Sequence, residues 1–157
     1  MNLFKTYTFL FFLFITSCAT TSLVTNPIDE NVLNDLYVSE INIGYADGVT
    51  KDSKLDFLLK TEIQKVLGAR YTSKGDDILE ITIQGLSMVD KVMSGFFGAF
   101  AGGNELVIEV VLLRNGEEKG RFLVDETYNA GGYNAVVNIQ KNMAQRATRQ
   151  IKKILGL

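Results

Sequence analysis

Histidine is absent from the 157-residue chain, and cysteine and proline each occur once. Without histidine, a Ser-His-Asp triad and metal ligation by imidazole are both excluded. A single cysteine can form no disulfide within the chain and has no histidine to activate it as a nucleophile. The formal net charge is −2, so no strong basic field is available for nucleic acid. We therefore predict no catalytic residues, no metal or dissociable cofactor, and no nucleic acid partner.

Long apolar runs are also missing, except at the N-terminus. The apolar residues 7–15 follow Lys5 and end shortly before the only cysteine, Cys18. This run is too short to cross a bilayer about 30 Å thick as a helix, but it has the length of a signal-peptide core. The sequence therefore predicts an exported protein.

The four residues Ile15-Thr16-Ser17-Cys18 resemble a bacterial lipobox. The resemblance implies cleavage between Ser17 and Cys18, diacylglycerol on the Cys18 thiol and an acyl chain on its new α-amine. Such chains anchor a protein stably, because each buried CH₂ contributes about 0.8 kcal/mol. Ala19 is a non-acidic residue after the cysteine, which in such lipoproteins favours the outer membrane. An ordinary signal peptide with an incidental cysteine is the alternative.

The polar composition of residues 19–35, which include the only proline, predicts a flexible tether with a reach of about 20 to 25 Å. We therefore expect a signal peptide at 1–17, a lipid-anchored tether at 18–35 and a single domain at 36–157.

Within that domain, period-two alternation of apolar residues predicts four strands, at 37–45, 77–86, 105–114 and 121–128. Asn115-Gly116 predicts a tight hairpin between the last two strands. Apolar residues at helical spacing predict one helix from Ser53, its N-cap, to Gly68, and another that begins near Asn134. The order β-α-β-β-β-α indicates a two-layer α+β fold, in which two helices cover a four-stranded mixed sheet. The first helix connects parallel strands, and the last three strands form an antiparallel meander.

The segment SGFFGAFAGG, residues 94–103, combines three phenylalanines with four glycines. Its glycine spacing fits neither a Walker loop nor a dinucleotide fingerprint, and the next element is a strand, so phosphate binding is excluded. Two interpretations remain. Phe96, Phe97 and Phe100 either pack onto the domain or form an exposed docking loop for a partner or for lipid.

Charged residues form two further patterns. The adjacent acidic pairs at 76–77, 117–118 and 125–126 would point to opposite faces of a strand, so we expect them to be solvated rather than catalytic. The last helix carries a basic stripe, which is either a solvated face or a surface for anionic lipid or an acidic partner. The stripe contains Lys141, Arg146, Arg149, Lys152 and Lys153.

The second half of the chain is similar to an uncharacterised family of bacterial envelope lipoproteins, classed as a domain of unknown function. The segments that carry this resemblance are SGFFGAFAGG, LVIEVVLL, RNGEEKG, RFLVDETY, NAGG and the helix from Asn134. A weaker likeness is to the plug lipoprotein of lipopolysaccharide transport, which has two helices on a small sheet and a lipid tether.

Together these patterns predict a non-enzymatic, lipid-anchored lipoprotein of the cell envelope. We expect an accessory or assembly component at the outer membrane, with its domain in the periplasm and an envelope protein as partner. One alternative is a small lipid- or glycan-binding module, which requires an apolar pocket between helices and sheet. The other is a hydrolase that uses carboxylates alone, which requires two of them converging in a cleft.

Overall fold

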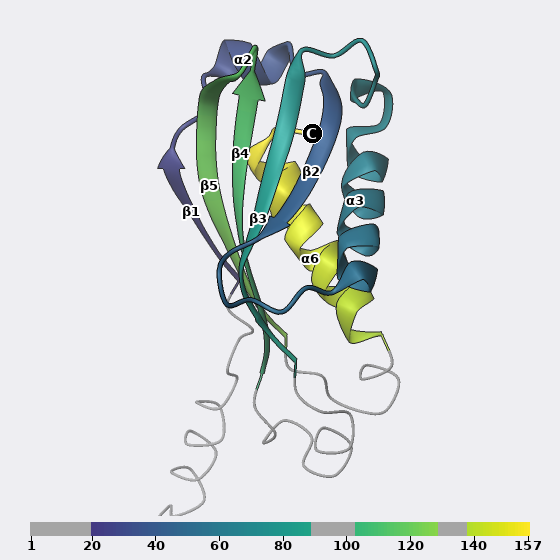
Figure 1. The fold of residues 1–157 in the computed structure, drawn as a ribbon. Coiled ribbons are helices and arrows are strands. Elements are labelled where there is room, and N and C mark those ends of the chain that lie inside the picture. The colour runs from purple at the N-terminus through teal and green to yellow at the C-terminus, as the bar shows by residue number, and fades with distance from the viewer. Residues whose placement is uncertain (1–19, 89–102, 129–137) are drawn as a thin grey trace, which may run out of the picture.

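The computed structural model describes residues 20–88, 103–128 and 138–157. In these residues a five-stranded sheet has the order β1-β5-β4-β3-β2 (Figure 1). The strands are β1 (Thr20–Asn26), β2 (Val38–Tyr45), β3 (Asp77–Ser87), β4 (Asn104–Arg114) and β5 (Glu117–Tyr128). The α-helices are α2 (Glu30–Asn34), α3 (Ser53–Leu67) and α6 (Ile139–Ile154), and a 3₁₀ turn, η2 (Gly68–Arg70), follows α3.

The predicted four-stranded sheet with two helices is wrong, although the class remains α+β. Strand β1 adds a fifth strand and α2 adds a third helix, and both come from residues that we assigned to the flexible tether. β1 runs antiparallel to β5, from Thr20 opposite Glu126 to Asn26 opposite Arg121. Backbone pairing along an existing strand orders this segment, although it has too few apolar residues to show an alternating pattern.

The remaining strand pairings agree with the prediction. β2 and β3 are parallel and joined through α3, whereas β3, β4 and β5 form an antiparallel meander. The turn between β4 and β5 has φ angles of 53° at Asn115 and 79° at Gly116. Two successive residues with positive φ are what a type I′ hairpin turn requires, and Asn-Gly adopts this conformation readily.

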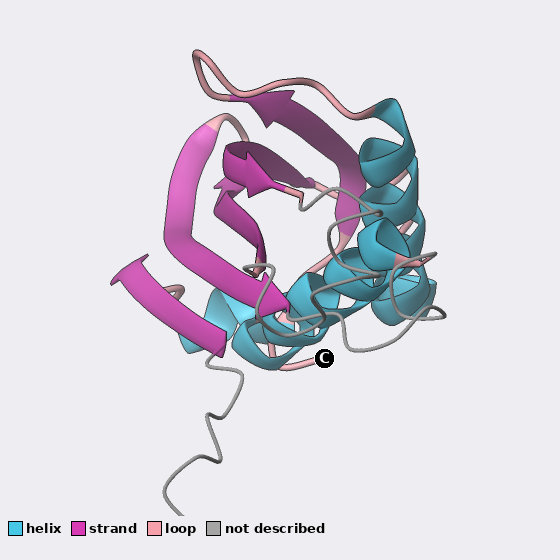
Figure 2. Cartoon of the chain, turned by 90° about the horizontal axis from the view of Figure 1, so that it is seen from below, coloured by secondary structure: helices cyan, strands magenta, loops and turns pink. Residues whose placement is uncertain are grey.

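The hydrophobic core lies between the sheet and the two long helices. The sheet curves around this core, and α3 and α6 lie side by side on its concave side (Figure 2). Inward-facing residues alternate along β3, β4 and β5, as the period of a strand requires. The fully or almost fully buried apolar side chains include Leu79, Ile81, Ile83, Leu106, Ile108, Val110, Phe122 and Val124 of the sheet, and Leu55, Leu59, Ile63, Met143, Ala147 and Ile151 of the helices.

The beginnings of the two long helices differ in detail from the sequence prediction. Asp52, rather than Ser53, is the N-cap of α3, and its carboxylate accepts hydrogen bonds from the amides of Lys54 and Leu55, each at 3.0 Å. Helix α6 begins at Ile139 in the described residues, and the predicted cap Asn134 lies outside them.

The sheet has two distinct ends, which we name by what lies there. The loop end contains the last residues of β2, β3 and β5 and the first residues of β1 and β4 (Figure 1). The helices α3 and α6 also begin at this end. At the hairpin end lie α2 and the turn at Asn115 and Gly116. None of the helices in the described ranges is long and apolar enough to span a membrane.

Candidate functional site

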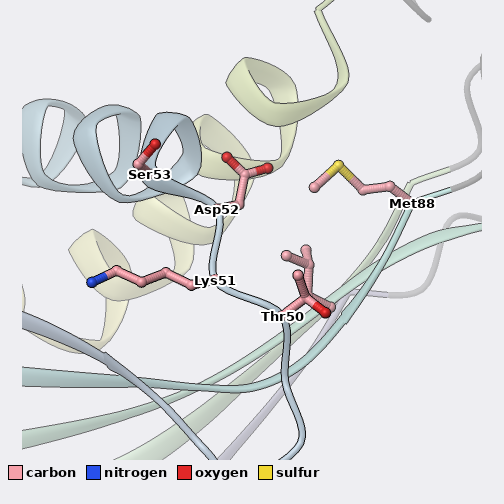
Figure 3. Close-up of a pocket in the computed structure, with 6 residues that line it drawn as sticks. Thr50, Lys51, Asp52, Ser53 and Met88 are labelled. Carbon is pink, nitrogen blue, oxygen red and sulfur yellow. The ribbon is translucent and has the colours of Figure 1, made fainter.

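The loop end carries an open pocket of about 390 Å³ between the start of α3 and the end of β3. Met88 points across this pocket toward Asp52, whereas Lys51 points away from it (Figure 3). Met88 is 38% exposed, which is a large fraction for an apolar side chain. The pocket is lined by Thr50, Lys51, Asp52, Ser53, Leu86 and Met88.

Asp52 connects the two long helices at this end. One carboxylate oxygen caps α3, and the other accepts a hydrogen bond of 2.8 Å from the Gln140 side chain of α6. Partial burial acts to raise the pKa of Asp52, but the hydrogen bonds from Gln140 and from the amides of Leu55 and Lys54 outweigh it, so the pKa is lowered. Asp52 is therefore a charged helix cap at neutral pH and a poor proton donor.

Tyr45, at the end of β2, contacts the same turn of α3. Its hydroxyl donates a hydrogen bond of 2.5 Å to Asp56 and accepts one of 2.9 Å from the Asp52 amide. Burial, followed by the hydrogen bond to Asp56, raises the pKa of Tyr45 to about 12. The phenol therefore stays neutral, and both nearby carboxylates are engaged in contacts that fix the start of α3.

A second polar cluster ties α6 to β5. Glu126 is fully buried on the helix-facing side of β5, and its carboxylate lies 3.3 Å from the guanidinium Nε of Arg146. The same guanidinium lies 5.5 Å from the centre of the Tyr128 ring, and the Tyr128 hydroxyl accepts a hydrogen bond of 3.0 Å from Asn142. Arg146, a member of the basic stripe, thus faces the sheet instead of solvent, and the stripe is not uniformly solvated.

A third polar cluster lies at the hairpin end. Arg114 forms two hydrogen bonds to Asp77, of 2.7 and 2.9 Å, and donates a third, of 2.8 Å, to the backbone carbonyl of Asp35. Asp77 also accepts a hydrogen bond of 2.9 Å from the Tyr37 amide. These contacts close the chain between α2 and β2 onto the sheet. A second pocket of about 390 Å³ lies beside them, and Asp35, Lys74, Asp76 and Arg114 are among its lining residues.

The prediction that all three acidic pairs are solvated is wrong for two of them. Asp77 and Glu126 are buried, and each faces an arginine. Only the pair Glu117 and Glu118 behaves as expected, with ion pairs to Lys119 and Arg121 near the surface. Sequence reasoning missed both buried contacts because their partners are distant in the chain. A usable signal was Arg114, which follows the apolar run Val110 to Leu113 at the end of β4.

Strand β1 presents an exposed sheet edge. It contains no charged residue and no proline. Its two apolar residues, Leu23 and Val24, are 58% and 45% exposed. β1 is the outermost strand of the sheet in the described residues and pairs there with β5 on one side. An edge with these properties is able to pair with a further strand, because no charge on it opposes an approaching chain.

The residues predicted for anchoring and docking lie outside the described residues. These are Ser17 and Cys18 at the predicted cleavage and lipidation site, and Phe96, Phe97 and Phe100 of the candidate docking loop. The described residues that flank the Phe-rich segment, Met88 and Gly103, both lie at the loop end. In the described ranges, no group of three or more acidic or cysteine side chains could hold a metal ion.

No family model and no curated protein matches the chain. Solved structures do resemble it. The PelC dodecamer of Paraburkholderia phytofirmans has a TM-score of 0.54 at 10% identity, and the match covers 85% of this chain and 98% of PelC. This likeness shows that the chain shares the fold of PelC.

Two further solved structures have lower TM-scores. A protein of Caulobacter crescentus CB15 that has been proposed to be a lipoprotein is 26% identical, with a TM-score of 0.44 and coverage of 80% of this chain and 92% of that one. A Xanthomonas campestris protein from a family of unknown function is 10% identical, with a TM-score of 0.48 and coverage of 84% and 89%.

Proposed function

We propose that the protein is a non-enzymatic, lipid-anchored component of the bacterial cell envelope, with an accessory or assembly role and its domain in the periplasm, at the outer membrane. The observation that supports this most directly is the position of the lipobox-like cysteine. Cys18 lies two positions before the first residue of β1, and β1 is an uncharged, exposed edge strand. In this proposal the uncharged edge of β1 begins two residues after the anchor.

The assembly role rests on the β1 edge. Soluble proteins usually protect such edges with charges, proline or a covering loop, and β1 has no charge and no proline. An extended segment of a partner protein can add to the edge through main-chain hydrogen bonds, while side-chain contacts at Leu23 and Val24 contribute specificity. We propose an envelope protein as this partner. PelC, which shares this fold, is a dodecamer. The partner could therefore include another copy of the present chain, and crosslinking would detect it.

We propose a protein without catalytic activity because the partly and fully buried carboxylates described above are engaged in structural contacts. Asp52 and Asp56 hold the start of α3, and the two buried carboxylates face arginines. The binding-module alternative finds little support, because the space between the helices and the sheet is filled by buried apolar side chains.

The anchor is tested by labelling cells with an alkyne analogue of palmitate and isolating the protein. We expect the label in the native chain and in a Thr16→Ala control, which changes the tolerated middle residue of the lipobox. Cys18→Ala should abolish the label and shift the protein out of the washed membrane fraction. A native chain that carries no label would contradict the proposed function.

A further inference from the structure

We propose that the loop end of the domain lies directly against the phospholipid surface, with the strands extending away from the membrane. The inference rests on the proposed anchoring at Cys18 and adds to it a defined orientation and a contact surface. The feature that carries it is the short stretch of chain between Cys18 and β1.

The distance available to the anchor follows from where β1 begins. Thr20 is the first residue of β1 and pairs with Glu126 of β5. It lies two positions after Cys18, and an extended chain spans at most about 3.6 Å per residue, so Cys18 lies within about 7 Å of the sheet. A flexible tether to residue 35 would have allowed about 20 to 25 Å. The domain therefore has little freedom to move away from the bilayer or to turn over.

Strand direction decides which end faces the lipid. Because β1 is antiparallel to β5, Thr20 lies at the end where β5 finishes. At the same end Asn104 begins β4 opposite Tyr128, and Ser87 ends β3 opposite Glu105. Figure 1 shows these strand ends together at the bottom of the molecule, with the beginnings of α3 and α6. The short anchor thus brings the whole loop end to the membrane surface.

The described side chains at this end are compatible with a headgroup surface. Met88 offers an exposed apolar group, and Lys51 and Lys54 are exposed cations that can meet lipid phosphates. Asp47 and Glu105 are exposed at the same end. The contact therefore depends on the anchor and on the proximity that it imposes, and not on a net positive charge.

The opposite end is then held far from the lipid. Strand β5 contains 12 residues. At a rise of about 3.4 Å per residue it separates the hairpin turn from the loop end by up to about 37 Å along the strand. Glu117, whose side chain is 76% exposed, lies beside that turn and marks the hairpin end. Reporters at Met88 and at Glu117 therefore sample the two ends of the molecule.

The test uses tryptophan, which the native chain lacks. The full chain is produced with a single tryptophan, as Met88→Trp or Glu117→Trp, and reconstituted in phosphatidylcholine vesicles that contain a lipid with a nitroxide on its headgroup. We expect quenching of the Met88→Trp fluorescence to exceed that of Glu117→Trp at least several-fold. Equal quenching at both positions, or stronger quenching at Glu117→Trp, would overturn the orientation.

A variant with a longer linker tests whether the short connection between Cys18 and β1 sets the orientation of the domain. Insertion of about 15 Gly and Ser residues between Ala19 and Thr20 restores a reach of about 20 Å. Vesicle association should remain, whereas the difference between the two reporters should fall. An unchanged difference would overturn the claim that the short connection sets the orientation.

Failure of the anchor and failure of the orientation give different results. Mass spectrometry of the same protein shows whether Cys18 carries acyl chains, and an unmodified cysteine contradicts the proposed function. In that case the Cys18 thiol, the only one in the chain, is coupled to a maleimide phospholipid and the quenching is measured again. Acylated or coupled protein with equal quenching at both reporters overturns the orientation alone.

Discussion

Arg114 links β4 to two other segments at the hairpin end, where it bonds the Asp77 carboxylate and the backbone of Asp35. We expect Arg114→Ala to lower the free energy of unfolding by about 3 kcal/mol, because the buried Asp77 carboxylate would lose its counter-ion. Urea denaturation measures this change.

Lys119 provides the matched control, because it also pairs with a carboxylate, but the Glu117 side chain is 76% exposed. Lys119→Ala should change stability by less than about 0.5 kcal/mol. Similar losses for the two variants would contradict the distinction between a buried and an exposed ion pair in this protein.

Asp52 predicts a pH dependence. Its pKa is lowered in the folded protein by hydrogen bonds from Gln140 and two amides, which outweigh the opposing effect of burial. A lowered folded-state pKa gives stability that is present above the unfolded pKa, about 3.9, and is lost as the pH falls through the folded value. Asp52→Asn keeps a capping side chain but removes the charge.

We therefore expect the native protein to be more stable than Asp52→Asn at pH 7, by up to about 1 kcal/mol. The difference should shrink as the pH is lowered from about 5 to about 3. Thermal unfolding of both proteins across this range measures it, and a difference that does not vary with pH would show that the carboxylate charge is not responsible.

Among the elements, the β4–β5 hairpin depends on backbone conformation. Gly116 has a φ of 79°, and a Cβ at this position would meet no neighbouring atom within 4 Å. Gly116→Ala should therefore cost about 1 kcal/mol or more from the strained backbone alone. Gly44→Ala in β2 is the control, since it has equal space and no positive φ. Chemical denaturation should show a loss for Gly116→Ala only, and equal effects would contradict this explanation.

The elements that the sequence predicted are those whose order depends on burying apolar side chains. β3 and β4 alternate clearly because every second residue enters the core, and α3 presents a stripe of leucine and isoleucine for the same reason. β1 contributes only Leu23 and Val24, both exposed, and α2 has no buried residue. β1 depends on its pairing with β5. α2 has a local N-cap, Asp29, and packs Val32 and Leu33 partly against the core, but it is too short to show a helical period.

The polar contacts of the site were predictable only in part. The sequence predicts the start of α3 to within one residue, with Ser53 as the cap, whereas Asp52 is the cap in the structure. The partners of Asp77 and Glu126 come from other elements, 37 and 20 residues away in the chain. A sequence pattern records spacing within an element, whereas these contacts follow from how elements are placed against each other.

At the scale of the whole molecule, the exposed edge strand makes a prediction about assembly. Leu23→Lys places a charge on β1 and should reduce strand addition by a partner. Crosslinking in native cells should therefore recover fewer partner adducts than for the native chain. Phe57→Lys is the control, because Phe57 is 69% exposed on α3, away from the edge. Undiminished adducts with Leu23→Lys would contradict a partner at this edge.

The pairing of β1 with β5 also has a consequence for the order in which the chain folds. Thr20 pairs with Glu126, so β1 leaves the ribosome early but cannot join the sheet until β5 exists. The meander β3–β4–β5 closes much shorter loops and should form first. Until β1 joins, the outer edge of β5 is open to any matching strand, including β1 of a neighbouring copy. Refolding at high protein concentration should therefore favour strand-exchanged dimers, whereas dilution should favour closure of each chain on itself.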